Sequence, residues 1–518
     1  MSKKVLFCTV LGFLMICVLL TVQASGAEET TATDLDPRPG KIIWVGPDLS
    51  SADAHMWEVV GDKQIHSNYI ESLVRYLGAG KCEPALATSW ENSPDMLTWT
   101  FKLREGVKFN NGDSFTAQDV VWSTLRCKNM PVGTLKNYLS TLEEVVALDD
   151  YTVRFVFSKP NPLQLYNIFM AVRVYSKKQA ERDGEKFYEK FVGTGPWKVV
   201  EWKPGQYFRF ERNKDWYGEF VEGAPTMIEM RPIPEESTRI AALLTGEVDV
   251  VDNVSAEPMK LIEKSSIAYA IRRSGIECND ITMKNDRPPF NDSKLRQAMD
   301  YLVPRESIVK NLTGQGTPAV VWSLPEHPWF PEELKGMVKP FDKEMAKKLI
   351  AESNYKGEQI RLITRRGRTP KDVEIAELLA EIWKSVGLNV KVEVVSDSAY
   401  SQRRSAGDYE MFSTGWTNNS PALNYSEKFP AHQINRHKVD PKFNEMVESL
   451  AAEGDWDKFV EKEKEIERYL YQDPAVLHIW HFDLIWGLSK RIQHLETWAG
   501  ELPVFYEKTV LAPSARAK

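Results

Sequence analysis

Two histidines near the end of the chain stand close together and carry side chains that bind metal ions. His478 and His481 lie three positions apart, and imidazole nitrogens are common zinc ligands. The segment around them, 475–480, is apolar and predicts a β-strand, in which residues three positions apart point to opposite faces. The sequence therefore argues against zinc binding by this pair, and it predicts no metal site elsewhere.

The familiar motifs of enzyme active sites are absent from this sequence. It contains no GxSxG nucleophile elbow, no phosphate-binding Walker loop and no HExxH zinc motif. The Gly-Thr-Gly turn at 193–195 is followed by proline and lacks the third glycine of a dinucleotide-binding turn. Carboxylate pairs at 149–150 and 235–236 lie in polar stretches that predict exposed surface. We therefore predict a protein that is not an enzyme and has no cofactor, with a secreted hydrolase of unfamiliar fold as the alternative.

The length and charge of the chain exclude several further classes. With 518 residues it is too long for one ordinary domain and suits two or three. Hydrophobic residues make up 42% and charged residues 27%, which is the composition of a globular protein. The 66 basic and 73 acidic residues give a net charge of −7, so nothing favours binding to nucleic acid.

The first 27 residues have the three parts of a secretory signal peptide. Two lysines at 3–4 give a cationic start, an apolar run covers 5–22, and small residues follow Gln23 at 24–27. Signal peptidase requires small side chains at positions −1 and −3, so we expect cleavage after residue 26 or 27. An uncleaved anchor helix is the alternative, because the apolar run is almost long enough to span a bilayer.

The cysteines bear on both the location and the cross-linking of the mature chain. Cys17 follows Ile16 rather than a small residue, so we expect no lipid anchor and predict a periplasmic protein. Cleavage would leave Cys82, Cys127 and Cys278, an odd number without CxxC spacing. They are expected to be small buried side chains, and a Cys82–Cys127 or Cys82–Cys278 disulfide remains an alternative.

Apolar periodicity and turn residues predict a mixed α/β fold with helices on the faces of its sheets. Helices are expected at 65–76, 117–126, 237–244, 443–450 and 457–471, the second of them with Thr116 as its N-cap. Strands are expected at 41–45, 97–103, 151–157, 198–200 and 207–212. Later, a strand, a long amphipathic helix and another strand follow one another at 359–363, 370–386 and 388–395. This last unit predicts a β–α–β crossover of the usual length.

Several blocks of the sequence resemble one known family. Residues 84–91 (PALATSWE), 103–112 (LREGVKFNNG) and 115–121 (FTAQDVV) are similar to the first signature of the solute-binding protein family 5 of ABC importers. Residues 193–197 (GTGPW) and 201–205 (EWKPG) resemble its second block. This family comprises peptide-, oligopeptide- and nickel-binding proteins. The chain departs from the pattern at Met96, where the first block commonly has glycine, and we expect this to alter one turn only.

The resemblance implies a clamp of two lobes joined by paired hinge strands, with an extra domain inserted in the first lobe. In this sequence lobe I would comprise 28–60, 195–275 and 485–518, the inserted domain 61–194, and lobe II 276–484. The resemblance also implies a monomer that performs no covalent chemistry. It would bind a solute in the cleft between the lobes and present it to the permease subunits of an ABC importer.

The resemblance places the ligand near Trp416, in the segment 415–421 (GWTNNSP). Peptide-binding relatives carry an aspartate shortly after this tryptophan, which pairs with the α-ammonium group of the peptide. This chain has Asn418 and Asn419 instead. A free N-terminus would then be held less tightly, unless Asp408 or Glu410 replaces the missing charge. The two amides suit neutral polyhydroxylated ligands or blocked peptides equally well, and they could merely cap a loop.

Aromatic and basic residues supply the remaining candidates for ligand contact. The 16 tryptophans include Trp322, whose flat ring would suit sugar rings or peptide planes unless it belongs to the core. Arg404, beside Arg403, could hold a ligand carboxylate in a bidentate pair, or both could be solvated. We predict a receptor for a peptide or peptide-like polar solute. An oligosaccharide, an opine-like compound or, less favoured, a nickel chelate is the alternative.

Overall fold

The computed structural model describes residues 38–516, except 47, 57–59, 79, 134, 367–368, 418–440 and 497–505. The predicted signal peptide, 1–27, lies outside the described residues. Within the described ranges, no helix combines the length and the apolar character that crossing a membrane would require.

An eleven-stranded mixed sheet runs through the molecule and confirms the predicted fold class. Its strands follow the order β15–β14–β16–β12–β17–β11–β1–β10–β9–β8, and β13 pairs with β17. Their bounds are β1 Lys41–Gly46, β8 Trp197–Lys203, β9 Tyr207–Arg212, β10 Met227–Pro232, β11 Val250–Val251, β12 Ala268–Met283, β13 Thr317–Pro318, β14 Ile360–Thr364, β15 Val390–Val394, β16 Met411–Thr417 and β17 Val476–Ser489. Parallel pairs join β1 to β10 and β11, and β14 to β15 and β16.

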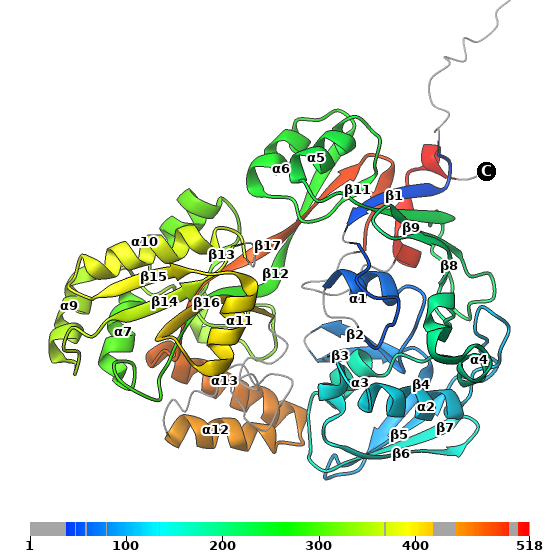
Figure 1. Ribbon diagram of the computed structural model, residues 1–518, viewed down its shortest axis with the longest axis horizontal. Coiled ribbons are helices and arrows are strands. Elements are labelled where there is room, and N and C mark those ends of the chain that lie inside the picture. Colours follow the sequence, from blue (N-terminus) through cyan, green and yellow to red (C-terminus); the bar gives the residue numbers. More distant parts are fainter. Residues whose placement is uncertain are drawn as a thin grey trace, which may run out of the picture.

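Strands β12 and β17 connect the two halves of the molecule (Figure 1). Residues 268–274 of β12 pair with 483–489 of β17 in the half that contains β1. Residues 278–282 pair with 476–481 in the half that contains β14. The register shifts between Ser274 and Cys278, so the regular ladder is interrupted where the strands pass from one half to the other.

Gly275 lies in this interruption and has no room for a side chain. A Cβ atom there would be 2.3 Å from the carbonyl oxygen of Phe482 on the neighbouring strand. We expect Gly275→Ala to lower the free energy of unfolding by about 2 kcal/mol, because the added methyl group pushes against backbone. Chemical denaturation measures this, with Gly454→Ala as the control, since a Cβ at Gly454 meets the flexible Met96 side chain at 3.2 Å. Equal losses in the two variants would contradict the expectation.

A separate antiparallel sheet forms the part of the molecule at the lower right of Figure 1. Its order is β4–β5–β7–β6, with a hairpin β2–β3 beside it. The bounds are β2 Val74–Gly78, β3 Lys81–Pro84, β4 Ala87–Asn92, β5 Thr98–Leu103, β6 Leu142–Asp149 and β7 Thr152–Phe157. Helix α2 (Ala117–Lys128) has Thr116 as its N-cap, as predicted, and the Thr116 backbone N–H donates to Asp119 Oδ2 at 2.8 Å. The buried side chains of this sheet and of α2 form one hydrophobic cluster with those of α12 and α13.

Helices cover both faces of the large sheet. The remaining described α-helices are α1 Val60–His66, α3 Gln164–Ala171, α4 Lys177–Asp183, α5 Glu236–Leu244, α6 Ala256–Glu263, α7 Ser293–Tyr301, α8 Arg305–Ser307, α9 Lys343–Glu352, α10 Asp372–Lys384, α11 Asp397–Ala406, α12 Pro441–Ala451 and α13 Trp456–Gln472. The unit β14–α10–β15 is the predicted crossover. A small pair, β18 (Ile492–His494) with β19 (Val510–Leu511), lies near the C-terminus.

The structure bears on three local expectations from the sequence: the helix at 65–76, the turn at Met96 and the pairing of the cysteines. The helix predicted at 65–76 is wrong, because α1 ends at His66 and the chain enters β2 at Val74, where pairing with β3 replaces helical bonding. Met96 has a φ of 57°, a region that favours glycine, which explains why glycine suits this turn. Cys82, Cys127 and Cys278 form no disulfide with any residue that the structure describes.

Candidate ligand-binding site

In each half of the molecule, the parallel strands end together at one edge of the sheet. In one half Gly46 of β1 pairs with Pro232 of β10 at their carboxyl ends. In the other, Thr364 of β14 pairs with Val394 of β15. Helices α1 and α11, which follow β1 and β15, lie on the facing sides of the two halves (Figure 1). Ligands of open α/β sheets bind beyond the carboxyl ends of the strands, so this region is the candidate site.

Asp252, directly after β11, is the acidic group at this edge of the first half. Its Oδ1 accepts a hydrogen bond from Trp44 Nε1 at 2.8 Å, and its Oδ2 accepts one from Gln64 Nε2 at 3.2 Å. Both donors are neutral, and among the described residues none forms an ion pair with Asp252. Burial raises its pKa to about 7, and the two hydrogen bonds only partly offset this effect. A ligand cation would stabilise the ionised form of this carboxyl group.

Arginines stand at the corresponding edge of the second half. Arg365 directly follows β14, and its guanidinium carbon lies 4.5 Å from the centre of the Tyr400 ring. Arg404 of α11 lies 5.9 Å from the same ring and 5.6 Å from that of Phe412. The Tyr400 hydroxyl donates to the Ser413 carbonyl at 2.8 Å, which fixes the ring between the two cations. Both guanidinium groups bring positive charge to this edge, which would attract a ligand carboxylate.

The charged residues next to these arginines form ion pairs with one another. Arg403 Nη1 lies 2.6 Å from Glu393 Oε2, and Arg403 Nε lies 3.0 Å from Asp408 Oδ2. Arg361 contacts Asp408 at 2.7 Å and Glu410 at 2.8 Å. Asp408 and Glu410, the acids considered as replacements for the aspartate of peptide-binding relatives, are therefore both engaged with arginines of this chain.

The residues expected around Trp416 are only partly placed by the structure. Asn418 and Asn419 lie outside the described residues. The backbone of Trp416 lies on β16, opposite Cys278 of β12. Next to it, a Cβ at Gly415 would be 2.5 Å from Thr369 Cγ2, and Thr369 Oγ1 accepts from Asn279 Nδ2 at 2.6 Å. The packing at this corner requires glycine before the tryptophan.

The Trp322 ring is placed in the core rather than on a surface. It is 0% exposed and packs 5.6 Å from the His478 ring. In this conformation a ligand would reach it only after the core had repacked. Sequence reasoning missed Asp252, Gln64 and Arg365, because no motif marks them: Asp252 and Arg365 gain their positions from strand ends, and Gln64 gains its position from helix α1.

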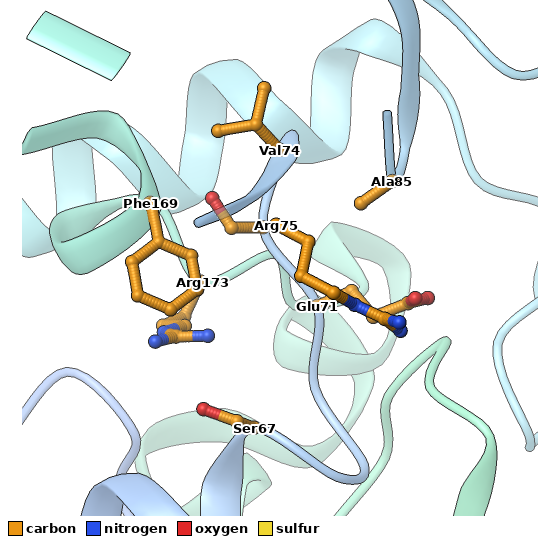
Figure 2. Close-up of a pocket in the computed structure, with 8 residues that line it drawn as sticks. Ser67, Glu71, Val74, Arg75, Ala85, Phe169 and Arg173 are labelled. Atoms are coloured by element: carbon orange, nitrogen blue, oxygen red, sulfur yellow. The ribbon is translucent and has the colours of Figure 1, made fainter. Parts of the chain in front are cut away.

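A small pocket next to α1 was also not anticipated from the sequence (Figure 2). It is lined by Ser67, Glu71, Ser72, Val74, Arg75, Ala85, Phe169 and Arg173. Its volume of about 20 Å³ has room for a water molecule rather than for a solute. Burial raises the pKa of Glu71 to about 7, although its carboxylate accepts from the Tyr217 hydroxyl at 2.7 Å. We therefore assign this pocket a structural role.

Comparison with known proteins identifies the relatives of this fold. NikA of Brucella suis, solved with Fe(III)-EDTA, superposes with a TM-score of 0.79 at 21% identity, covering 91% of this chain and 100% of its own. DppA of Helicobacter pylori, solved with the peptide STSA, gives 0.73 at 23% identity, covering 92% and 98%. The periplasmic oligopeptide-binding protein OppA of Haemophilus influenzae is 27% identical over 486 residues, covering 85% of this chain and 88% of its own.

The fold is therefore that of the two-lobed type II periplasmic binding proteins. Residues 81–432, more than half of the 518, match the family model of the bacterial extracellular solute-binding proteins, family 5 Middle. The chain belongs to this family, which confirms the resemblance found in its sequence blocks.

Proposed function

We propose that this protein is the periplasmic receptor of an ABC importer, that it captures a peptide or peptide-like polar solute, and that it delivers this solute to a membrane permease. The family match over residues 81–432 carries the proposal. The protein acts as a monomer, catalyses no reaction and binds no nucleic acid. Its lobes have the boundaries given above: 28–60, 195–275 and 485–518 for lobe I, 61–194 for the inserted domain and 276–484 for lobe II.

The mechanism depends on the two strands that join the halves. A ligand that contacts both halves binds the closed arrangement more tightly than the open one, and it therefore shifts the population towards closure. The interruption of the ladder between Ser274 and Cys278 supplies the place at which β12 and β17 bend. Closure would bring Asp252 of one half towards Arg365 and Arg404 of the other.

The charges on the two sides favour a ligand with both an ammonium and a carboxylate group. Asp252 is paired only with neutral donors among the described residues, whereas Arg365 and Arg404 carry positive charge at the strand ends of the other half. A peptide has both groups, and a neutral oligosaccharide has neither. An opine-like compound or a metal chelate that presents carboxylates remains the second candidate, because arginines alone could hold it.

A thermal-shift panel tests this proposal. We expect di- to pentapeptides to raise the melting temperature, since a ligand at one hundred times its Kd adds about 2.7 kcal/mol to the free energy of unfolding. Oligosaccharides serve as matched uncharged compounds, and opines and nickel–histidine chelates complete the panel. Stabilisation by oligosaccharides with no response to any peptide would exclude the peptide receptor. Conversion of a stabilising compound into a product would indicate an enzyme.

A further inference from the structure

Four side chains with metal-binding atoms share one face of the strands that join the two halves. Cys278 and Asp280 lie two residues apart on β12, so their side chains point the same way. On β17, His481 is opposite Cys278 and His478 is opposite Asp280. Directly paired residues of an antiparallel ladder share a face. The sequence-based prediction that the two histidines point to opposite faces is therefore wrong, because a register shift between Asn279 and Asp280 adds one residue to β17.

Three of these side chains are close enough to contact a single ion. One donor atom each from Cys278, Asp280 and His478 lies within 4.8 Å of the other two. His478 Nδ1 is 2.8 Å from Asp280 Oδ1. Donor atoms around a tetrahedral zinc ion lie about 3.3 to 3.8 Å apart, as follows from its bond lengths. Small side-chain rotations would therefore bring the three groups to zinc distances.

The cluster is buried and contains polar atoms whose hydrogen bonding is incomplete. Cys278 and Asp280 are 0% exposed and His478 is 5% exposed. Among the described residues, Asp280 Oδ2, His478 Nε2 and His481 Nδ1 have no hydrogen-bond partner. Such atoms are rare in native interiors, and each calls for a partner. The other ring nitrogen of His481 lies 3.3 Å from the Val321 carbonyl oxygen, the backbone contact that metal-bound histidines commonly make.

We propose that Cys278, Asp280 and His478 form a structural Zn²⁺ site, with His481 as the fourth ligand. Sulfur, imidazole and carboxylate donors together suit zinc better than magnesium or calcium. The Cys278 thiolate and the Asp280 carboxylate would balance the two charges of the ion while both histidines stay neutral. Binding releases to solvent the thiol proton and any additional proton that the Asp280–His478 pair holds in the metal-free protein.

Zinc would also remove an unfavourable feature of the metal-free cluster. Burial raises the pKa of both the Cys278 thiol and the Asp280 carboxyl group, because an isolated anion is poorly solvated there. The ion would join β12 to β17 directly beside the interruption at 274–278. It would thus stiffen the lobe II end of the strand pair without taking part in ligand binding, and the inference is independent of the proposed function.

Metal analysis of the full-length mature protein tests the site. Protein prepared with ZnCl₂ and dialysed free of unbound metal is expected to hold one Zn²⁺ per chain, released on denaturation. We expect Cys278→Ser and His478→Gln each to lower the zinc affinity at least tenfold. Cys127→Ser is the control, because Cys127 is also a fully buried thiol but lies on α2 and outside this cluster.

A second measurement keeps the inference testable if those variants fail to fold. In a Cys82→Ser/Cys127→Ser protein, Cys278 is the only cysteine left after signal cleavage. Loading it with Co²⁺ should produce the absorption band of a cobalt–thiolate bond, and Zn²⁺ should abolish this band. Absence of the band together with no bound zinc in the wild type would show that the cluster is only a hydrogen-bonded Cys–Asp–His network.

Discussion

Asp252→Asn is expected to weaken the binding of peptides with a free N-terminus about thirtyfold, which corresponds to about 2 kcal/mol for a hydrogen bond to a charged group. The variant keeps the shape of the side chain and loses the negative charge; its carboxamide oxygen can still accept from Trp44 Nε1, and its NH2 group can donate to Gln64 once the Gln64 amide has turned over. Isothermal titration with each peptide and its N-acetylated counterpart measures the effect. Binding of the acetylated form should change little, because it brings no cation to the site.

Asp95→Asn is the matched control for this experiment. Asp95 is exposed in the turn between β4 and β5, away from the candidate site, and its Oδ1 accepts the backbone N–H of Leu97 at 3.1 Å. This variant should therefore leave the affinity for both peptide forms unchanged. If Asp252→Asn retains the wild-type ratio of affinities for free and acetylated peptides, Asp252 does not recognise the ammonium group, although the receptor function would stand.

The titration of the Asp252 carboxyl group predicts that peptide affinity depends on pH. Since the pKa of Asp252 is about 7 without ligand, the group is largely neutral at pH 5 and ionised at pH 8. Affinity for peptides with a free N-terminus should rise over this interval, and Asp252→Asn should flatten the rise. The folded protein holds this proton at a higher pH than the unfolded chain does. Its contribution to the stability of the ligand-free protein therefore falls as pH rises from about 4 towards 7.

Arg305→Met is expected to lower the free energy of unfolding, and this is the second large effect. Arg305 forms a buried ion pair with Asp300, which also contacts Lys339 Nζ at 2.6 Å. The Nε of Arg305 donates to the His478 carbonyl at 2.7 Å and thereby connects α8 to β17. Removal of one partner from a buried ion pair costs 3–5 kcal/mol, and we expect about 3 kcal/mol because Lys339 remains. Denaturant titration measures the loss.

The pH dependence of this loss distinguishes the ion pair from packing. Burial alone would raise the pKa of Asp300, but Arg305 and Lys339 outweigh burial and hold it below its usual value. This stabilisation is present above the unfolded pKa of about 4 and is lost as pH falls through the folded pKa. The difference between wild type and Arg305→Met should therefore shrink in acid.

Arg182→Met is the surface control for Arg305→Met. Arg182 is exposed and lies 3.2 Å from Asp183 and 3.9 Å from Asp113. Exposed pairs of this kind contribute about 0–1 kcal/mol. An equal loss in both variants would mean that the Arg305–Asp300 pair contributes no more than a surface contact.

Much of the fold could be predicted from local patterns. Helix α2 with its Thr116 cap and the unit β14–α10–β15 follow from the spacing of apolar residues, which a helix or a strand repeats within a few positions. The prediction at 65–76 failed because pairing of β2 with β3 overrides a helical pattern. The family could also be inferred, since its blocks are contiguous stretches of sequence.

The residues of the candidate site could not be predicted from the sequence, because only the tertiary structure brings them together. Asp252 and Trp44 are separated by 208 positions, and Asp280 and His478 by 198, yet each pair is hydrogen bonded. The bulge that turns His478 and His481 to one face is a property of the ladder between β12 and β17. The sequence alone thus determined the order of elements and the family, because both depend on neighbours along the chain. Which polar groups meet was decided only by folding, because strand register and burial depend on residues far apart in sequence.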